Sequence, residues 1–104
     1  MRFHIRNEGV ENLEIYYHGT SYEDLADILK FGLLPQEPHR AVYLVGDPNS
    51  ALVWGPVILK IEVPKGFVLD TEFGLLAPKG IPPFYIKVHR RIPQEEWEEM
   101  DIRR

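Results

Sequence analysis

The chain has 104 residues, 44% of them hydrophobic, and a formal net charge of −4. This length suits one ordinary domain, so we expect residues 1–104 to form a single domain with its core at about residues 14–90. The negative charge argues against a general nucleic-acid-binding protein, because affinity for phosphate backbones comes largely from Lys and Arg. The chain has no cysteine, which excludes disulfides, thiolate nucleophiles and sulfur-bound zinc.

The sequence also argues against a membrane protein and against a metal-binding protein. The sequence has no run of about 18 apolar residues, and its start, "MRFHIRNEGV", lacks the apolar stretch of a signal peptide. We therefore expect a soluble, cytoplasmic protein without membrane contacts. The four histidines show no metal-ligand spacing, so we expect no metal. One basic run, "KVHRR" (residues 87–91), is interpreted as a solvated strand edge rather than a phosphate site.

The first predicted elements are two strands and a helix. The segments "FHIR" and "LEIYYH" alternate apolar and polar residues as half-buried strands do, with a turn at "NEG". In "SYED", Ser21 is placed to cap a helix, with Asp24 three residues later and apolar residues at helical spacing beyond. Gly32 is predicted to end this helix.

The remaining elements are mostly short strands. The predicted strands are "AVYLVG", "PVILKIEVP", "FVLD", "EFGLLAP" and "PPFYIKVHRRIP". A helical turn is expected in "DPNSALVW", where Asp47 caps and Pro48 takes the first helical position. The tail "PQEEWEEMDIRR" is predicted to form a short acidic helix that docks through Trp97 and Met100. Many short strands, few helices and no regular β-α-β alternation predict an α+β fold.

The order of several motifs resembles a known family. "HGTS", "ILKFGLLP", "AVYLVGDPNSA" and "EFGLLAPKGIPPFYIKV" follow one another as in the ADP-ribosyltransferase fold. The chain is similar to the branch with a His-Tyr-Glu triad, which includes the poly(ADP-ribose) polymerases and diphtheria-type toxins. The resemblance implies a compact fold of short, mainly antiparallel strands in a split sheet, with two or three short helices.

The resemblance also implies a site. His18, Tyr43 and Glu72 take the places of the catalytic triad. A carboxylate at Glu72 would stabilise the positively charged ribose that forms as nicotinamide leaves, and the Tyr43 ring would stack on nicotinamide. Taken singly, each of these residues has an ordinary structural explanation, as a turn histidine, a core tyrosine or a surface carboxylate. The implied NAD-binding residues are His18, Gly19, Thr20, Tyr43, Ser50 and Trp54.

The implied activity is ADP-ribosyl transfer from NAD with release of nicotinamide. The acceptor is left open between protein, nucleic acid and a small molecule, and a toxin would also need an antidote protein as a partner. A non-catalytic module that binds NAD or ADP-ribose is one alternative. A plain interaction domain, which would use the Trp97 tail or the basic edge, is another.

A second branch of the same fold gives a further alternative. The RNA 2′-phosphotransferases, which use NAD to remove an internal 2′-phosphate from spliced RNA, are similar in "HGTS", "GPVILKIEV" and "IPPFYIKV". Two of their features are absent. "AVYL" stands where they normally have H-V-H-L, and "ALVWGPV" contains no arginine before the long strand. Loss of those cations would remove groups that hold a phosphate.

Overall fold

The structure is a computed structural model that describes residues 13–102, so the predicted strand "FHIR" and turn "NEG" lie outside the described residues. No helix among the described residues is long and apolar enough to cross a membrane. The elements in chain order are β1 (Leu13–Thr20), α2 (Tyr22–Phe31), β2 (Val42–Leu44), α3 (Pro48–Ala51), the 3-10 helix η1 (Leu52–Trp54), β3 (Val57–Pro64), β4 (Leu69–Thr71), β5 (Gly74–Ala77), the 3-10 helix η2 (Pro83–Tyr85), β6 (Ile86–Arg91) and α4 (Gln94–Glu99).

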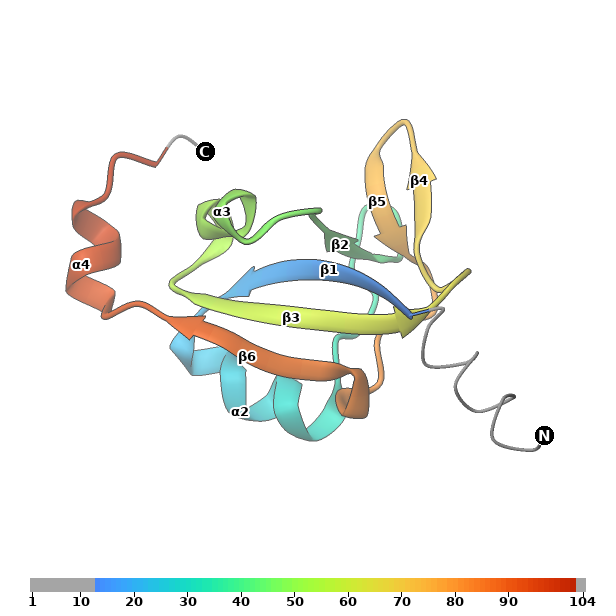
Figure 1. The fold of residues 1–104 in the computed structure, drawn as a ribbon, viewed down its shortest axis with the longest axis horizontal. Helices are drawn as coiled ribbons and strands as arrows, with labels where there is room; N and C mark the ends of the chain where they lie inside the picture. The colour runs from blue at the N-terminus through green and yellow to red at the C-terminus, as the bar shows by residue number, and fades with distance from the viewer. Residues whose placement is uncertain (1–12, 103–104) are drawn as a thin grey trace.

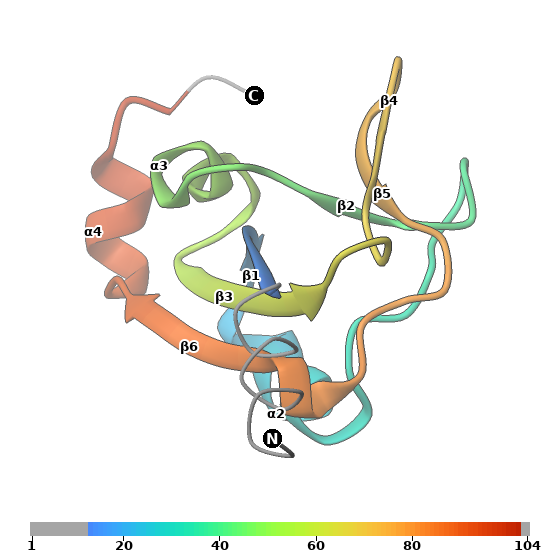
Figure 2. The ribbon, with the colours of Figure 1, turned by 45° about the vertical axis from the view of Figure 1, so that its right-hand side comes forward.

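The described strands form two sheets. One has the order β1-β3-β6 and the other β2-β5-β4, and every neighbouring pair is antiparallel. The sheets meet where Tyr17 and Val45 exchange backbone hydrogen bonds of 2.8 and 3.0 Å. Beyond that point they diverge, and the β4–β5 hairpin stands away from the first sheet (Figures 1 and 2). The predicted α+β class and the split arrangement of antiparallel strands are confirmed.

Helix α2 covers one face of the first sheet, and its ends follow the sequence signals. The Ser21 hydroxyl accepts a hydrogen bond from the Asp24 N–H at 3.2 Å, and Gly32 ends the helix with φ at 87°. Beneath α2, alternate residues of β3 are fully buried and supply much of the core (Figure 2). These inward side chains are Val57, Leu59, Ile61 and Val63, each 0% exposed.

Several predicted strands are longer than or shifted from the observed ones, and two of the strand starts differ for clear local reasons. The strand predicted to begin at Glu72 begins at Gly74, because Glu72 and Phe73 form the turn between β4 and β5. The last strand begins at Ile86, since the preceding residues Pro83–Tyr85 form a 3-10 helix. Proline has no N–H to donate to a strand ladder, which explains the later start.

The C-terminal helix docks through Trp97, as predicted. The Trp97 indole N–H of α4 donates to the Leu52 carbonyl oxygen at 2.8 Å, which ties α4 to η1. Figures 1 and 2 both show α4 beside α3 at the end of the first sheet. Trp97 and Met100 are half-buried, and the remaining side chains of this helix are exposed.

Candidate functional site

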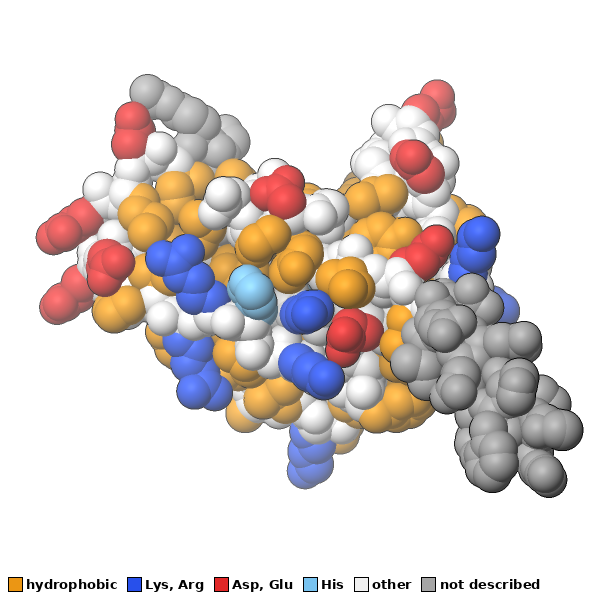
Figure 3. Space-filling view, viewed as in Figure 1, with side chains coloured by type: hydrophobic (Ala, Val, Ile, Leu, Met, Phe, Trp, Pro, Cys, Tyr) orange, Lys and Arg blue, Asp and Glu red, His pale blue; other side chains and the backbone are white. Residues whose placement is uncertain are grey.

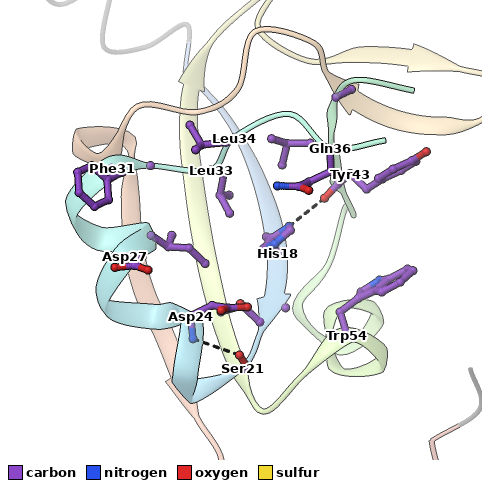
Figure 4. A pocket seen from close by; sticks show the side chains of 16 residues that line it. His18, Ser21, Asp24, Asp27, Phe31, Leu33, Leu34, Gln36, Tyr43 and Trp54 are labelled. Atoms are coloured by element: carbon purple, nitrogen blue, oxygen red, sulfur yellow. Dashed lines mark hydrogen bonds between the residues drawn. The ribbon is translucent and has the colours of Figure 1, made fainter. Parts of the chain in front are cut away.

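A pocket of about 650 Å³ lies where the two sheets diverge. Its walls come from the end of β1, the length of α2, strand β2 and the 3-10 helix η1 (Figure 4). Sites for small ligands and cofactors occupy roughly 300–1,000 Å³, so this pocket is large enough for a nucleotide. Five of the predicted site residues line it: His18, Gly19, Thr20, Tyr43 and Trp54.

His18 bridges the two sheets inside this pocket. Its Nδ1 lies 2.9 Å from the Tyr43 carbonyl oxygen, and because a carbonyl can only accept, Nδ1 carries the proton and donates it. Burial lowers the pKa of His18 below 6.5, with the hydrogen bond to Tyr43 as a smaller, opposing effect. The ring is therefore neutral at pH 7, and its Nε2 atom is left as a hydrogen-bond acceptor.

Two glycines fix the corner that carries His18 and Thr20. A Cβ atom on Gly19 would lie 1.9 Å from the Ala51 carbonyl oxygen, and one on Gly55 would lie 2.3 Å from the Thr20 carbonyl oxygen. The backbone of β1 therefore packs directly on α3 and η1. This packing by itself requires a glycine at position 19. Gly19 also lines the pocket, so its role in NAD binding stays a prediction.

Tyr43 is held by aromatic neighbours from outside the pocket. Its hydroxyl hydrogen-bonds Nδ1 of His39, and the His39 ring stacks on Phe73 with centroids 4.3 Å apart. A smaller pocket of about 190 Å³ adjoins the large one and shares His18, Tyr43 and Trp54 with it. Because Phe73 also lines this smaller pocket, the turn of the β4–β5 hairpin forms part of its wall.

Ser50 and Glu72 line neither pocket. The Ser50 N–H and hydroxyl donate to the two Asp47 carboxylate oxygens at 2.9 and 2.8 Å, which caps α3 and lowers the pKa of Asp47. Glu72 is exposed in the hairpin turn, next to Phe73. Roles for Ser50 in NAD binding and for Glu72 in catalysis therefore stay predictions.

The rim of the large pocket is acidic. Asp24 and Asp27 face it from α2, and no Lys or Arg among residues 13–102 lines it (Figure 4). Neither carboxylate was predicted from the sequence as a site residue, although the cap at Ser21 and the helical period place both on one side of α2. They can accept hydrogen bonds from sugar hydroxyls or a base amine. Within the described residues, no group of three His, Asp or Glu is placed to hold a metal.

The amino-acid sequence is similar to that of a known protein. "Probable RNA 2'-phosphotransferase 2" of Archaeoglobus fulgidus is 41% identical to this chain over 93 residues. The match covers 79% of this chain but 42% of the relative, so the chain spans less than half the length of that protein. No protein-family model matches the chain, and no solved structure matches it.

Proposed function

We propose that this chain forms the NAD-binding part of an enzyme related to the RNA 2′-phosphotransferases. The observation that carries the proposal is the 41% identity to the Archaeoglobus protein. In the proposed reaction, an oxygen of the RNA 2′-phosphate attacks the anomeric carbon of the nicotinamide ribose. The bond from that carbon to the nicotinamide nitrogen breaks, and nicotinamide leaves with the bonding electron pair. In a second step the neighbouring ribose hydroxyl attacks the phosphorus. The bond from phosphorus to the RNA 2′ oxygen then breaks, and that oxygen leaves with the electron pair and takes up the hydroxyl proton.

The pocket supplies groups suited to this substrate. The neutral His18 accepts a hydrogen bond from a ribose hydroxyl at Nε2, and the Thr20 hydroxyl, on the same side of β1, hydrogen-bonds the same sugar. The rings of Tyr43 and Trp54 lie on one side of His18 (Figure 4). Flat aromatic rings in this position stack on nicotinamide and hold it in the orientation from which it leaves.

The lining also favours a second candidate, ADP-ribosyl transfer to an acceptor that is not a phosphate. The large pocket has Asp24 and Asp27 at its rim and no Lys or Arg among its described lining residues. In this candidate, Glu72 supplies the carboxylate that stabilises the developing charge on the ribose. Glu72 lies next to Phe73 in the chain, and Phe73 lines the smaller pocket. The third candidate function is a module that binds NAD without turning it over.

The first experiment measures NAD binding by thermal unfolding. At about 100 times the dissociation constant, one-site binding adds about 2.7 kcal/mol of stability, and each 1 kcal/mol raises the Tm of a small domain by about 4–8 °C. We expect a saturable rise with wild type, no rise with His18→Ala, and the wild-type rise with the control His89→Ala, which lies outside both pockets. No rise with wild type at millimolar NAD would contradict all three candidates.

The second experiment follows release of nicotinamide from NAD. The protein is incubated with an RNA that carries one internal 2′-phosphate, and with the same RNA lacking it. Release that depends on the 2′-phosphate supports the phosphotransferase-like function. Release that does not need the phosphate supports ADP-ribosyl transfer, and binding without release supports the non-catalytic module.

A further inference from the structure

The charges of the described residues are unevenly distributed over the surface. The chain is acidic overall, yet four of the eight Lys and Arg residues between positions 13 and 102 lie on strands β3 and β6. Two of the fourteen Asp and Glu residues in the same range lie on the strands of that sheet. The β1-β3-β6 sheet therefore differs in charge from the rest of the molecule. The face of this sheet opposite α2 shows Lys and Arg side chains among hydrophobic side chains and a histidine (Figure 3).

The strand register aligns the cations on that face. Val57, Leu59, Ile61 and Val63 of β3 point into the core, so the alternate residues of β3 point outward. Tyr17 pairs with Lys60, and Lys60 pairs with Lys87, so the three side chains form one row across the sheet. We define the outer face by Ile15, Tyr17, Lys60, Glu62, Lys87, His89 and Arg90.

A β-bulge adds His89 and Arg90 to this face. Ile58 pairs with Arg90 while Leu59 pairs with Val88, so His89 is the extra residue of β6. Ile58 alternates with the inward residues of β3, which places its partner Arg90 on the outer face. The His89 ring meets the Tyr17 ring edge-on, with centroids 5.3 Å apart. An aromatic pair and several cations thus lie together on one side of the sheet.

The outer face keeps a net positive charge. Lys87 and Lys60 both lie near the Glu62 carboxylate, at 3.2 and 3.9 Å, so one carboxylate is shared by two lysines. Lys87 is 70% exposed, and Arg90 is exposed and has no ion pair to any described residue. Exposed ion pairs are weak, so an arriving phosphate can compete with Glu62 for Lys87.

The outer face is continuous with the candidate site through Tyr17. Tyr17 contacts His89 on the outer face and also lines the smaller pocket, together with His18, Tyr43 and Trp54. A polymer lying across Lys60, Lys87 and Arg90 would therefore reach the smaller pocket at Tyr17.

We propose that the outer face binds single-stranded RNA and directs a nucleotide toward the smaller pocket. The proposal rests on the proposed phosphotransferase-like function and deepens it by assigning a docking surface to the RNA. Tyr17 and His89 provide rings on which an unstacked base can lie, while Lys60, Lys87 and Arg90 bind the phosphates. A duplex offers neither exposed base faces nor a strand that can follow the sheet.

The test measures fluorescence anisotropy of a labelled short oligouridylate at several salt concentrations. Single-stranded binding weakens with salt by about 0.7 log units per log unit for each phosphate contact, so three contacts predict a slope near −2. This slope corresponds to about 20-fold weaker binding between 50 and 200 mM salt. We expect the triple variant K60Q/K87Q/R90Q to lose this salt dependence and at least tenfold in affinity at about 50 mM salt.

Matched variants distinguish RNA binding through the outer face from a general effect of net charge. The control K30Q/K65Q/K79Q makes the same change in net charge with three exposed lysines on other parts of the surface, and we expect it to bind within twofold of wild type. Tyr17→Ala is expected to weaken binding about fivefold or more through lost stacking, while Tyr17→Phe keeps the ring and the affinity. The Tm of each variant is measured alongside, and Tyr17→Phe serves as the folded reference.

Several outcomes would overturn the proposal. These are equal weakening by the two triple variants, equal affinity for an RNA duplex, or no wild-type binding at low salt. A concentration-dependent sedimentation coefficient that K60Q/K87Q/R90Q abolishes, with no RNA binding, would assign the face to a protein contact instead. The NAD-induced Tm rise is measured on the same variants. If RNA binds through this face but NAD does not bind, the proposed function fails while the docking surface stands.

Discussion

The Nδ1–H of His18 donates to the carbonyl oxygen of Tyr43, 2.9 Å away across the junction of the two sheets. The acceptor belongs to the backbone of β2, which pairs with β5, so its position is set by the second sheet. One hydrogen bond therefore fixes the tautomer and the orientation of the imidazole. It also leaves Nε2 free to meet a ligand hydroxyl.

The buried His18 should make stability depend on pH. Its pKa is lowered by burial in the folded chain, so between that value and 6.5 the unfolded chain binds more protons. The contribution of His18 to the free energy of unfolding is therefore largest above pH 6.5 and falls as the pH drops toward the folded pKa of His18. We expect the advantage of wild type over His18→Gln, measured by urea unfolding, to shrink between about pH 7.5 and pH 5.5. Parallel pH curves for the two proteins would contradict this assignment.

Gly19→Ala should destabilise the protein strongly. The added Cβ would lie 1.9 Å from the Ala51 carbonyl oxygen, so the β1 end and α3 must move apart. We expect a loss of about 3 kcal/mol in the free energy of unfolding, at the upper end for overpacked sites. Gly46→Ala is the control, since nothing lies within 4 Å of its added Cβ, and it should change stability by less than about 1 kcal/mol. Equal effects of the two substitutions would refute the close packing at Gly19.

Trp97→Phe tests the docking of α4. The substitution keeps an aromatic ring but removes the indole N–H that donates to Leu52 at 2.8 Å. We expect a loss of about 1 kcal/mol, or a fall in Tm of about 4–8 °C. Glu98→Gln, an exposed change on the same helix, should leave the Tm within about 2 °C. An unchanged Tm in Trp97→Phe would mean that this hydrogen bond contributes nothing to the docking of α4.

Glu72→Gln distinguishes the two candidate reactions. In the phosphotransferase-like reaction the attacking phosphate itself brings negative charge to the anomeric carbon, so we expect nicotinamide release to stay within about threefold of wild type. In ADP-ribosyl transfer to another acceptor, loss of the carboxylate should lower release by about 100-fold or more while NAD binding survives. Because Glu72 is exposed in a turn, the variant should keep the wild-type Tm, which makes the rates comparable.

Signals between neighbouring residues predicted local structure well. Ser21 and Gly32 bound the first helix, and Asp47 with Pro48 starts the second, because capping depends on residues three or four positions apart. The hairpin was harder to predict. The alternation in "EFGLLAP" does not show where the turn between β4 and β5 ends. In the structure the turn ends at Gly74, which has φ at 115°.

Long-range pairing could not be predicted from the sequence. Tyr43 pairs with Leu76 across the second sheet, and this register decides which ring and which carbonyl face His18. The contacts of His39 with Tyr43 and Phe73 depend on the same pairing, so His39 was seen only as a histidine without metal spacing. The motif order nevertheless predicted five residues that line one pocket: His18, Gly19, Thr20, Tyr43 and Trp54.

The interlock of Gly19 with Ala51 and of Gly55 with Thr20 has a consequence for ligand affinity. One wall of the pocket is preorganised, so a ligand loses no binding free energy to ordering of that backbone. The Trp54 side chain extends from η1 beside this wall, and the residue is 64% exposed. Adaptation to different ligands should therefore come from the exposed Trp54 ring, while the backbone of the His18–Thr20 corner keeps its position.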